Sequence, residues 1–317
     1  MVVPIYSEVS NQERHLLRVN RELSIVLYLK PLANPVTTLN SLYKVLQSNL
    51  NCELILIAEE KDAYQYDTLM EKFPVLRVIL PERKLTFAEV LEIGCRESFS
   101  NHVMFLDDTV LLENLPTEIF SLYYDDPQYG IMIPQLFNEK NEGLPSQIKC
   151  ILLHGFIQTV GRDKPQTAAP GLYPPHFCFI LNKTMFLERD FHLYDYENFL
   201  YTLAEIGWRV WKSDFWVIQV RQWRVVRLVD TPVEMEFSPD DEEYLLFHAR
   251  NIVQPALVRK QNAYLFSLLI QKILTLHFKH VRSIWQTLFH RKKFRSELEG
   301  FPLEDMAIFS IINKENA

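Results

Sequence analysis

Glycine is scarce in this 317-residue chain, which contains only 8 glycines. Loops of the GxGxxG and GxxxxGK[ST] types bind phosphate through clustered glycines, and neither pattern occurs in the sequence. The sequence therefore gives no support to a phosphate site built on either loop.

Cysteines and long apolar runs are also few. The four cysteines, Cys52, Cys95, Cys150 and Cys178, are far apart and form no CxxC pair. This pattern excludes a disulfide framework and a zinc cluster, so we expect small buried side chains in a reducing compartment. No run of 18 uninterrupted apolar residues occurs, and residues 1–20 are polar and charged. We therefore expect no membrane-spanning helix, no secretory signal peptide and a cytoplasmic location.

Negative charge is missing from one long segment. Residues 244–296 contain no Asp or Glu but ten Lys and Arg residues. Since the whole chain has a formal charge of −7, the remainder carries −17. An acidic body with a basic tail indicates two surfaces with different partners.

The hydrophobic pattern predicts an α/β fold. Short apolar runs predict strands over residues 23–29, 53–58, 75–80, 103–106, 130–134 and 177–181, and residues 209–220 are aromatic and β-like. Helical spacing predicts helices over residues 37–50, 66–73, 87–99, 116–124 and 199–206, the last one closed by Gly207. Residues 138–175 are rich in proline and predict a loop at the active or acceptor site. Alternating strands and helices favour a mostly parallel sheet flanked by helices.

The C-terminal part predicts a helical extension. We place the boundary between a domain of residues 1–235 and an extension of residues 236–317, which is helical over 244–289 with a break at Pro255. One helix face carries an apolar stripe, formed by Val281, Ile284, Trp285, Leu288 and Phe289. A basic amphipathic helix of this kind is suited to attach the protein to the anionic surface on the inner face of a membrane. Alternatively, the stripe packs on the body. Binding of nucleic acid by the basic and aromatic residues is disfavoured by the acidic body.

Two aspartates follow the predicted strand 103–106. Ligands of open α/β sheets bind beyond the carboxyl ends of the strands, where Asp107 and Asp108 stand. Two adjacent carboxylates are suited to Mg²⁺ or Mn²⁺, and such an ion could bridge to a diphosphate. A polar turn that ends the strand and caps the next helix would use the same residues.

The order of these pieces along nearly the whole chain resembles a bacterial-type family 2 glycosyltransferase with a GT-A fold. The resemblance rests on SIVLYLKPLANPVTTLNSLYKVLQ, ELILIAEEKDA, PERKLTFAEVLEIG, VMFLDDTVLL, DDPQYGIMIP, GFIQTVG, FCFILNKTMF, DFHLYDYENFLYTLAEIGWRVW and HARNIVQPALVRK. No single piece is specific, but their order is.

The resemblance implies a Rossmann-like sheet and an inverting hexosyl- or deoxyhexosyltransferase. Such an enzyme moves a sugar from a nucleotide-diphosphate donor to a glycan or lipid-linked acceptor in surface polysaccharide synthesis. Glu59, Glu60, Asp62, Lys84 and Asp107 would then contact the donor. Asp107 and Asp108 would hold Mg²⁺ or Mn²⁺.

The base that deprotonates the acceptor would be Asp195, with Glu197 as the second choice. Acidic residues are also favoured at a helix start by the backbone dipole, so both could serve that purpose instead.

Several positions depart from the family pattern. Thr109 follows the Asp pair where D-x-D is usual, and Gln219 stands where a metal-binding His is common. Lys84, Leu85 and Thr86 replace the Asn-x-Gly positions. These departures raise the alternative of a catalytically inactive, glycosyltransferase-like binding or scaffold subunit.

Overall fold

The computed structural model describes most of the chain. The described residues are 6–10, 21–29, 35–46, 51–58, 64–73, 76–115, 128–162, 169–189, 191–228, 234–275, 281–295 and 303–313. The predicted helix over residues 116–124 lies outside them.

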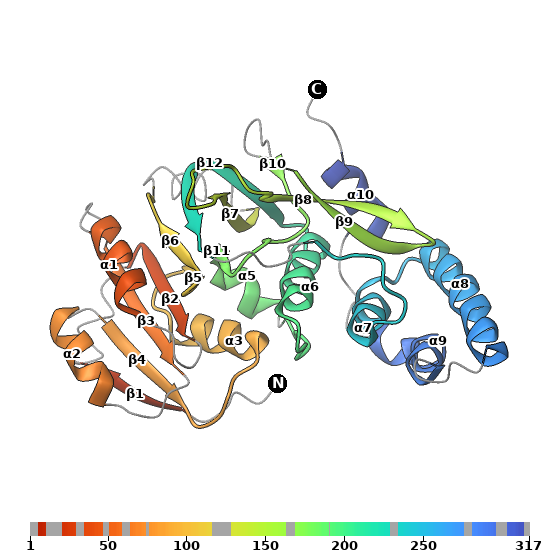
Figure 1. The fold of residues 1–317 in the computed structure, drawn as a ribbon, viewed down its shortest axis with the longest axis horizontal. Helices are drawn as coiled ribbons and strands as arrows, with labels where there is room; N and C mark the ends of the chain where they lie inside the picture. Colours follow the sequence, from red (N-terminus) through yellow and green to blue (C-terminus); the bar gives the residue numbers. More distant parts are fainter. Residues whose placement is uncertain are drawn as a thin grey trace.

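A long mixed sheet runs through the molecule (Figure 1). Its strands are β1 (Tyr6–Ser10), β2 (Leu23–Leu29), β3 (Cys52–Ala58), β4 (Leu76–Pro81), β5 (His102–Asp107), β6 (Val110–Leu112), β7 (Tyr129–Phe137), β10 (Ala169–Pro170), β11 (Cys178–Asn182) and β12 (Trp216–Arg227). They are ordered β1-β4-β3-β2-β5-β11-β7-β12-β10, and β6 pairs with β12.

The half of the sheet that carries β4, β3, β2 and β5 is parallel. Each residue of β2, β3 and β4 is buried, which explains why the sequence shows uninterrupted apolar runs rather than alternation. Beyond β5 the sheet is mixed: β11 is antiparallel to both β5 and β7, whereas β12 is parallel to β7. The prediction of a mostly parallel sheet flanked by helices is confirmed.

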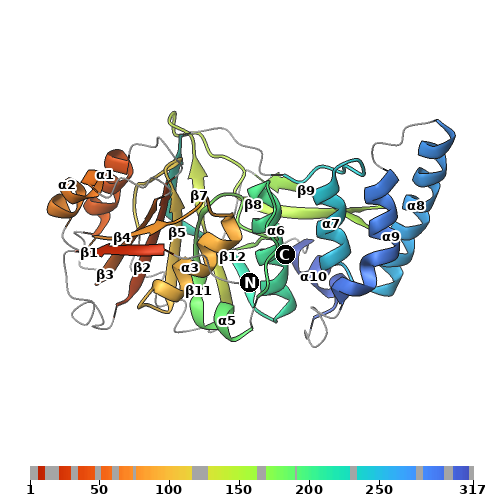
Figure 2. The ribbon, with the colours of Figure 1, turned by 90° about the horizontal axis from the view of Figure 1, so that it is seen from below.

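Helices cover both faces of the sheet (Figure 2). The first face carries α1 (Pro35–Leu46) and α2 (Tyr64–Lys72), whose apolar residues share one core cluster with Leu27 of β2. The second face carries α3 (Phe87–Glu97), α5 (Lys183–Glu188) and α6 (Phe199–Lys212). Val26 and Tyr28, which alternate with Leu27, belong to the cluster on this second face. The sheet therefore separates two apolar layers.

Helix α6 is longer than the sequence predicts. Gly207 does not end it, and the β-like interpretation of residues 209–215 is wrong, because the helix continues to Lys212 and β12 begins at Trp216. A Cβ atom at residue 207 would lie 2.5 Å from the carbonyl oxygen of Leu172 and 2.6 Å from the Cβ of Tyr173. Glycine is thus present for close backbone approach rather than as a helix stop.

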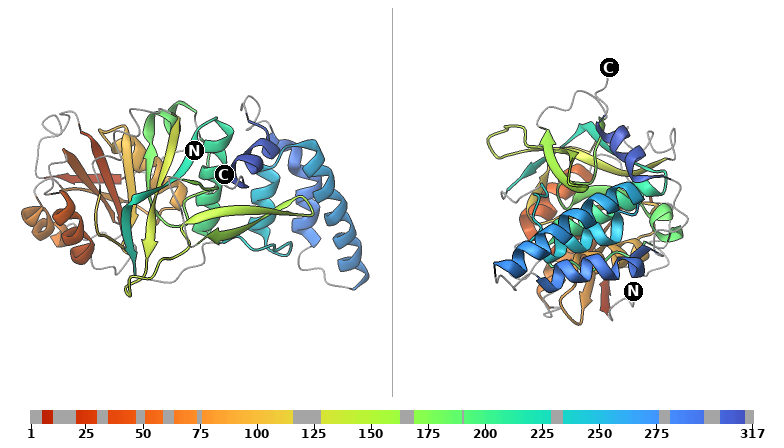
Figure 3. Two further views of the ribbon diagram at one scale, coloured as in Figure 1. Left: turned by 90° about the horizontal axis from the view of Figure 1, so that it is seen from above. Right: turned by 90° about the vertical axis from the view of Figure 1, so that its right-hand side faces the viewer.

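The proline-rich segment, in which the sequence also shows a strand-like piece over residues 150–160, contains a hairpin of two strands. Strands β8 (Gln147–Leu153) and β9 (Phe156–Arg162) form a separate two-stranded sheet that reaches the C-terminal helices (Figure 3, left). Its turn packs on the helix that begins at Pro255, because Gln261 donates 2.7 Å to the carbonyl oxygen of Gly155. His154 in the same turn stacks on Tyr264 at 4.6 Å between ring centroids.

The C-terminal part is helical, as predicted. It contains α7 (Glu242–Asn251), α8 (Pro255–Leu274), α9 (Val281–Arg295) and α10 (Asp305–Asn313). Pro255 occupies the first turn of α8, where its missing N–H is harmless. The core of the second sheet face includes Tyr244, Leu265 and Ile284, so apolar packing continues across the predicted boundary at residue 235, which stays a prediction. None of the described helices combines the length and hydropathy that crossing a bilayer requires.

Candidate functional site

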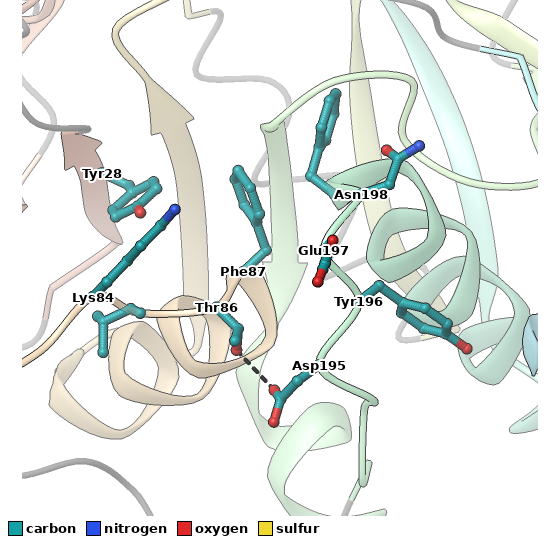
Figure 4. A pocket seen from close by; sticks show the side chains of 10 residues that line it. Tyr28, Lys84, Thr86, Phe87, Asp195, Tyr196, Glu197 and Asn198 are labelled. Atoms are coloured by element: carbon teal, nitrogen blue, oxygen red, sulfur yellow. Dashed lines mark hydrogen bonds between the residues drawn. The ribbon is translucent and has the colours of Figure 1, made fainter. Parts of the chain in front are cut away.

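A pocket of about 780 Å³ opens beside the carboxyl end of β2 (Figure 4). It is formed by three segments that are distant in the sequence: the end of β2, the start of α3 and the loop that enters α6. Its lining residues are Tyr28, Lys84, Leu85, Thr86, Phe87, Asp195, Tyr196, Glu197, Asn198 and Phe199. The location agrees with the rule that open α/β sheets bind ligands beyond the carboxyl ends of their strands.

Thr86 connects two of these segments. It caps the N-terminus of α3: its hydroxyl accepts from the backbone N–H of Glu89 at 3.3 Å, and Glu89 in turn accepts from the backbone N–H of Thr86 at 2.9 Å. The same hydroxyl donates to Oδ1 of Asp195 at 2.7 Å (Figure 4). The capping group of one helix therefore orients a carboxylate that precedes another.

Aromatic rings form the apolar part of the pocket. The Phe87 ring lies 5.6 Å from Tyr28 and 5.4 Å from Phe199, measured between centroids. Behind them, Phe177 packs 5.3 Å from Phe87. These edge-on and tilted contacts fix the rings against the sheet. Lys84, Asp195 and Glu197 remain exposed, so a charged, wet rim surrounds an apolar wall.

The Asp pair begins one strand away from this wall. Asp107 ends β5 directly beside Tyr28 of β2, and its Oδ1 accepts from the backbone N–H of Thr109 at 3.0 Å and from the Thr109 hydroxyl at 2.5 Å. Asp107 thus shapes a polar turn at the end of the strand, as the polar-turn interpretation predicts, but the turn leads into β6 and not into the helix that this interpretation expected. Asp108 is half-buried, and its buried Oδ1 has no hydrogen-bond partner among the residues that the structure describes. An orphaned carboxylate oxygen suits a hard cation.

The described part of the chain shows no third metal ligand near this pair. Among the described residues, no three His, Cys, Asp or Glu side chains gather where one ion could contact them all. Gln219 is buried, and its amide nitrogen bonds to the hydroxyl of Ser146. His176 is buried just before β11, where desolvation and the nearby charge of Arg227 lower its pKa to about 3. His176 is therefore a neutral side chain at ordinary pH.

The structure brings together three of the predicted site residues. Lys84, Asp195 and Glu197 line one pocket, although the first is more than a hundred residues from the other two. Asp107 and Asp108 lie at the end of β5 and are not among the pocket's lining residues. The three predicted donor contacts at the end of β3 lie outside the described residues, namely Glu59, Glu60 and Asp62.

Sequence reasoning missed several residues of the pocket. Tyr28, Phe87 and Phe199 resemble core hydrophobic positions, and only their place at an element's end distinguishes them. Thr86 carried a usable signal, because Thr86 followed three residues later by Glu89 is a capping box at the start of a helix.

Comparisons with known proteins identify solved structures of similar fold. No family model matches the chain, and no curated protein matches it. The crystal structure of GalNAc-T7 with UDP, GalNAc and Mn²⁺ superposes with a TM-score of 0.58 at 12% sequence identity, covering 90% of this chain and 59% of that one. S. aureus TarS superposes with a TM-score of 0.52 at 11% identity, covering 92% of this chain and 54% of that one. The chain thus spans less than two thirds of either protein, and both are glycosyltransferases of the GT-A type.

Proposed function

We propose that this chain, whose fold is the GT-A fold, is an inverting glycosyltransferase. It would transfer a hexosyl or deoxyhexosyl group from a nucleotide-diphosphate donor to a glycan or lipid-linked acceptor in surface polysaccharide synthesis. The observation that carries the proposal is the convergence of Lys84, Asp195 and Glu197 on one pocket beside β2. Asp107 ends the neighbouring strand β5, where it pairs with Tyr28 of the pocket wall.

In the reaction, the acceptor oxygen attacks the anomeric carbon while the bond from that carbon to the diphosphate oxygen breaks. The acceptor hydroxyl proton passes to a carboxylate of the pocket. Asp195 is the preferred base, because the Thr86 hydroxyl binds its Oδ1 and directs the group, which leaves its second oxygen for the acceptor. Glu197, exposed on the same rim, is the second choice.

The leaving diphosphate carries negative charge that must be stabilised. Asp107 and Asp108 would hold Mg²⁺ or Mn²⁺, which when bound neutralises a diphosphate. Lys84 stands at the pocket rim, where its ammonium group could form an ion pair with a donor phosphate. The aromatic wall of Tyr28 and Phe87 offers a surface on which a ring of the substrate can stack.

The C-terminal helices would attach the enzyme to the inner face of an anionic membrane. Helices α8 and α9 lie at the end of the molecule opposite to β1 (Figure 1), and they face the viewer in the end-on view (Figure 3, right). On α8, Phe266 is 56% and Leu274 is 77% exposed, and on α9 Trp285 and Phe289 are 51% and 58% exposed. Ile284, in contrast, is fully buried, so only part of the apolar stripe packs on the body.

Charge favours the same orientation. Residues 244–296 carry ten basic and no acidic residues, whereas the rest of the chain is strongly acidic. An anionic lipid surface would therefore attract this end and repel the other.

The decisive experiment is a donor screen. Purified protein is incubated with Mn²⁺ and a panel of nucleotide sugars, and release of the nucleoside diphosphate is measured. We expect turnover of one donor, its loss in Asp108→Ala, and its retention in Glu139→Ala, which removes an exposed carboxylate elsewhere. Absence of release with every donor and acceptor would contradict the enzymatic proposal.

An inactive binding or scaffold subunit is the second candidate. Thr109 after the Asp pair and the engaged, buried Gln219 favour it, because both stand where the related pattern places metal ligands. Calorimetry with Mn²⁺ and nucleoside diphosphates separates the two candidates. The inactive subunit would show no metal-dependent nucleotide binding.

A further inference from the structure

Four consecutive acidic residues precede and begin helix α7, and each contacts a different part of the protein. Asp240 accepts from Nζ of Lys272 in α8 at 2.8 and 2.9 Å to its two oxygens. Asp241 accepts from the Tyr201 hydroxyl of α6 at 2.7 Å. The first two residues of the run Asp240–Glu243 therefore link α7 to α8 and to α6.

The other two acids continue the pattern. Glu242 accepts from the hydroxyl of Ser283 in α9 at 2.5 Å. Glu243 accepts two backbone N–H groups of the loop that enters α6: that of Glu197 at 2.5 Å and that of Asn198 at 3.1 Å. These two residues line the candidate pocket, so a carboxylate of the C-terminal helices holds the pocket's own backbone.

We propose that Glu243 is a positioning residue, which fixes the Asp195–Asn198 loop so that the candidate base faces the pocket in the required geometry. The proposal rests on the proposed glycosyl transfer. The loop is held at two points: the Thr86 hydroxyl binds the Asp195 side chain itself, and Glu243 binds the backbone two and three residues later. The rest of the acidic run anchors Glu243 to α6, α8 and α9.

The energetics of Glu243 support a positional role. Desolvation raises the pKa of its carboxyl above the ordinary value, with the charges of Asp241 and Glu197 acting in the same direction, although the two backbone N–H groups lower it. The ionised form of Glu243 is thus less stable in the folded protein than in the unfolded chain. Glu243 therefore does not stabilise the fold through its charge, yet it binds two amides of the pocket loop. This combination is expected of a residue that fixes the position of the loop.

The test replaces Glu243 by glutamine, whose side chain has the same shape but only one acceptor oxygen. Because one of the two amides loses its acceptor oxygen, we expect the amide hydrogen of Glu197 or that of Asn198 to exchange with solvent roughly tenfold faster. A tenfold change corresponds to about 1.4 kcal/mol, close to what a hydrogen bond to a charged group contributes. We expect kcat to fall roughly tenfold to a hundredfold with the KM of the donor unchanged, as misplacement of a reacting group produces. Glu236→Gln, which removes an exposed charge nearby, should change neither.

Two further measurements keep the result unambiguous. In the unmodified protein, the amides of Glu197 and Asn198 should be protected at least about tenfold although both residues are exposed, and exchange at the free-peptide rate would overturn the proposal. Unchanged protection in Glu243→Gln would overturn it as well. If the unmodified protein turns over no donor, the proposed function fails, while the exchange data still decide whether Glu243 holds the loop.

Discussion

The hydroxyl of Thr86 donates a 2.7 Å hydrogen bond to Oδ1 of Asp195, across a separation of 109 residues. The same hydroxyl accepts from the backbone N–H of Glu89 and so begins helix α3. One oxygen atom therefore has two duties: it caps a helix and orients the carboxylate that we assign as the base. Stability and chemistry are coupled at this position.

Replacing Thr86 by valine, which has the same shape without a hydroxyl, should reduce both properties. Loss of the cap should lower the free energy of unfolding by about 1 kcal/mol in urea denaturation. Loss of the donor should also lower kcat, because Asp195 would no longer be held. Thr86→Ser keeps the hydroxyl and should retain most of the activity. Equal activity in the valine and serine variants would contradict the role of the Thr86 hydroxyl.

The identity of the base can be decided by two isosteric variants. Asp195→Asn should lower kcat by roughly 10² to 10⁴-fold, the range that general base catalysis contributes. Glu197→Gln should lower it less, and Glu188→Gln on α5, an exposed position outside the pocket, should leave it unchanged. Rates are measured at saturating donor. The opposite order of effects would assign the base to Glu197.

His176 should make the protein sensitive to acid. Its folded pKa of about 3 lies below the ordinary 6.5, because burial disfavours the charged form and Arg227 repels it. The unfolded chain therefore takes up the proton first, so the stability from neutral His176 is complete above pH 6.5 and is lost as the pH falls toward 3.

For His176 alone the loss between pH 8 and pH 5 should be about 2 kcal/mol. Urea unfolding at both pH values is compared with His176→Gln, which cannot titrate. An identical pH dependence in the two proteins would show that His176 does not carry the effect.

Exposed aromatic side chains of α9 should determine membrane attachment. Trp285 and Phe289 pack at 4.1 Å between ring centroids and are half exposed. Their replacement by serine should abolish sedimentation with vesicles rich in anionic lipid, since burial of apolar surface and attraction of basic residues act together. Leu187→Ser on α5 removes an exposed apolar side chain elsewhere and serves as control. Binding by the unmodified protein should weaken with salt, and binding that persists in the double variant would contradict this surface.

Much of the fold was predictable because its elements are locally consistent. The strands β2, β3 and β4 are mostly apolar, since both of their faces are covered, and short apolar runs of this kind favour buried strands. The sequence predicts too short a helix for α6, because Gly207 and four nearby tryptophans indicate a turn and a strand. Trp208 and Trp211 instead face the core of a helix, where their indole N–H groups reach the carbonyl oxygens of Asn251 and Gly171 at 2.9 Å. Such partners come from distant segments and leave no local trace in the sequence.

The candidate site was predictable only in part, for the same reason. Asp195, Glu197 and Lys84 were found through the order of pieces along the chain, which places them near the ends of elements. Glu243 was not found, because an acidic residue in the first turn of a helix is expected for the helix itself. Its contact with the backbone of Glu197 depends on how α7 packs beside α6, which spacing within α7 cannot reveal.

The contact at Gly207 has a consequence for the pocket. The backbone of α6 rests directly on residues 172–173 at this point, and eight residues, about 12 Å of helix, separate it from the first residue of α6 at the pocket. Helix α6 is therefore fixed near its middle by this contact, and its N-terminal end carries the pocket loop. Even one methyl group at residue 207 would push α6 away from residues 172–173. The shape of the pocket therefore depends in part on the absence of a side chain about 12 Å away along the helix.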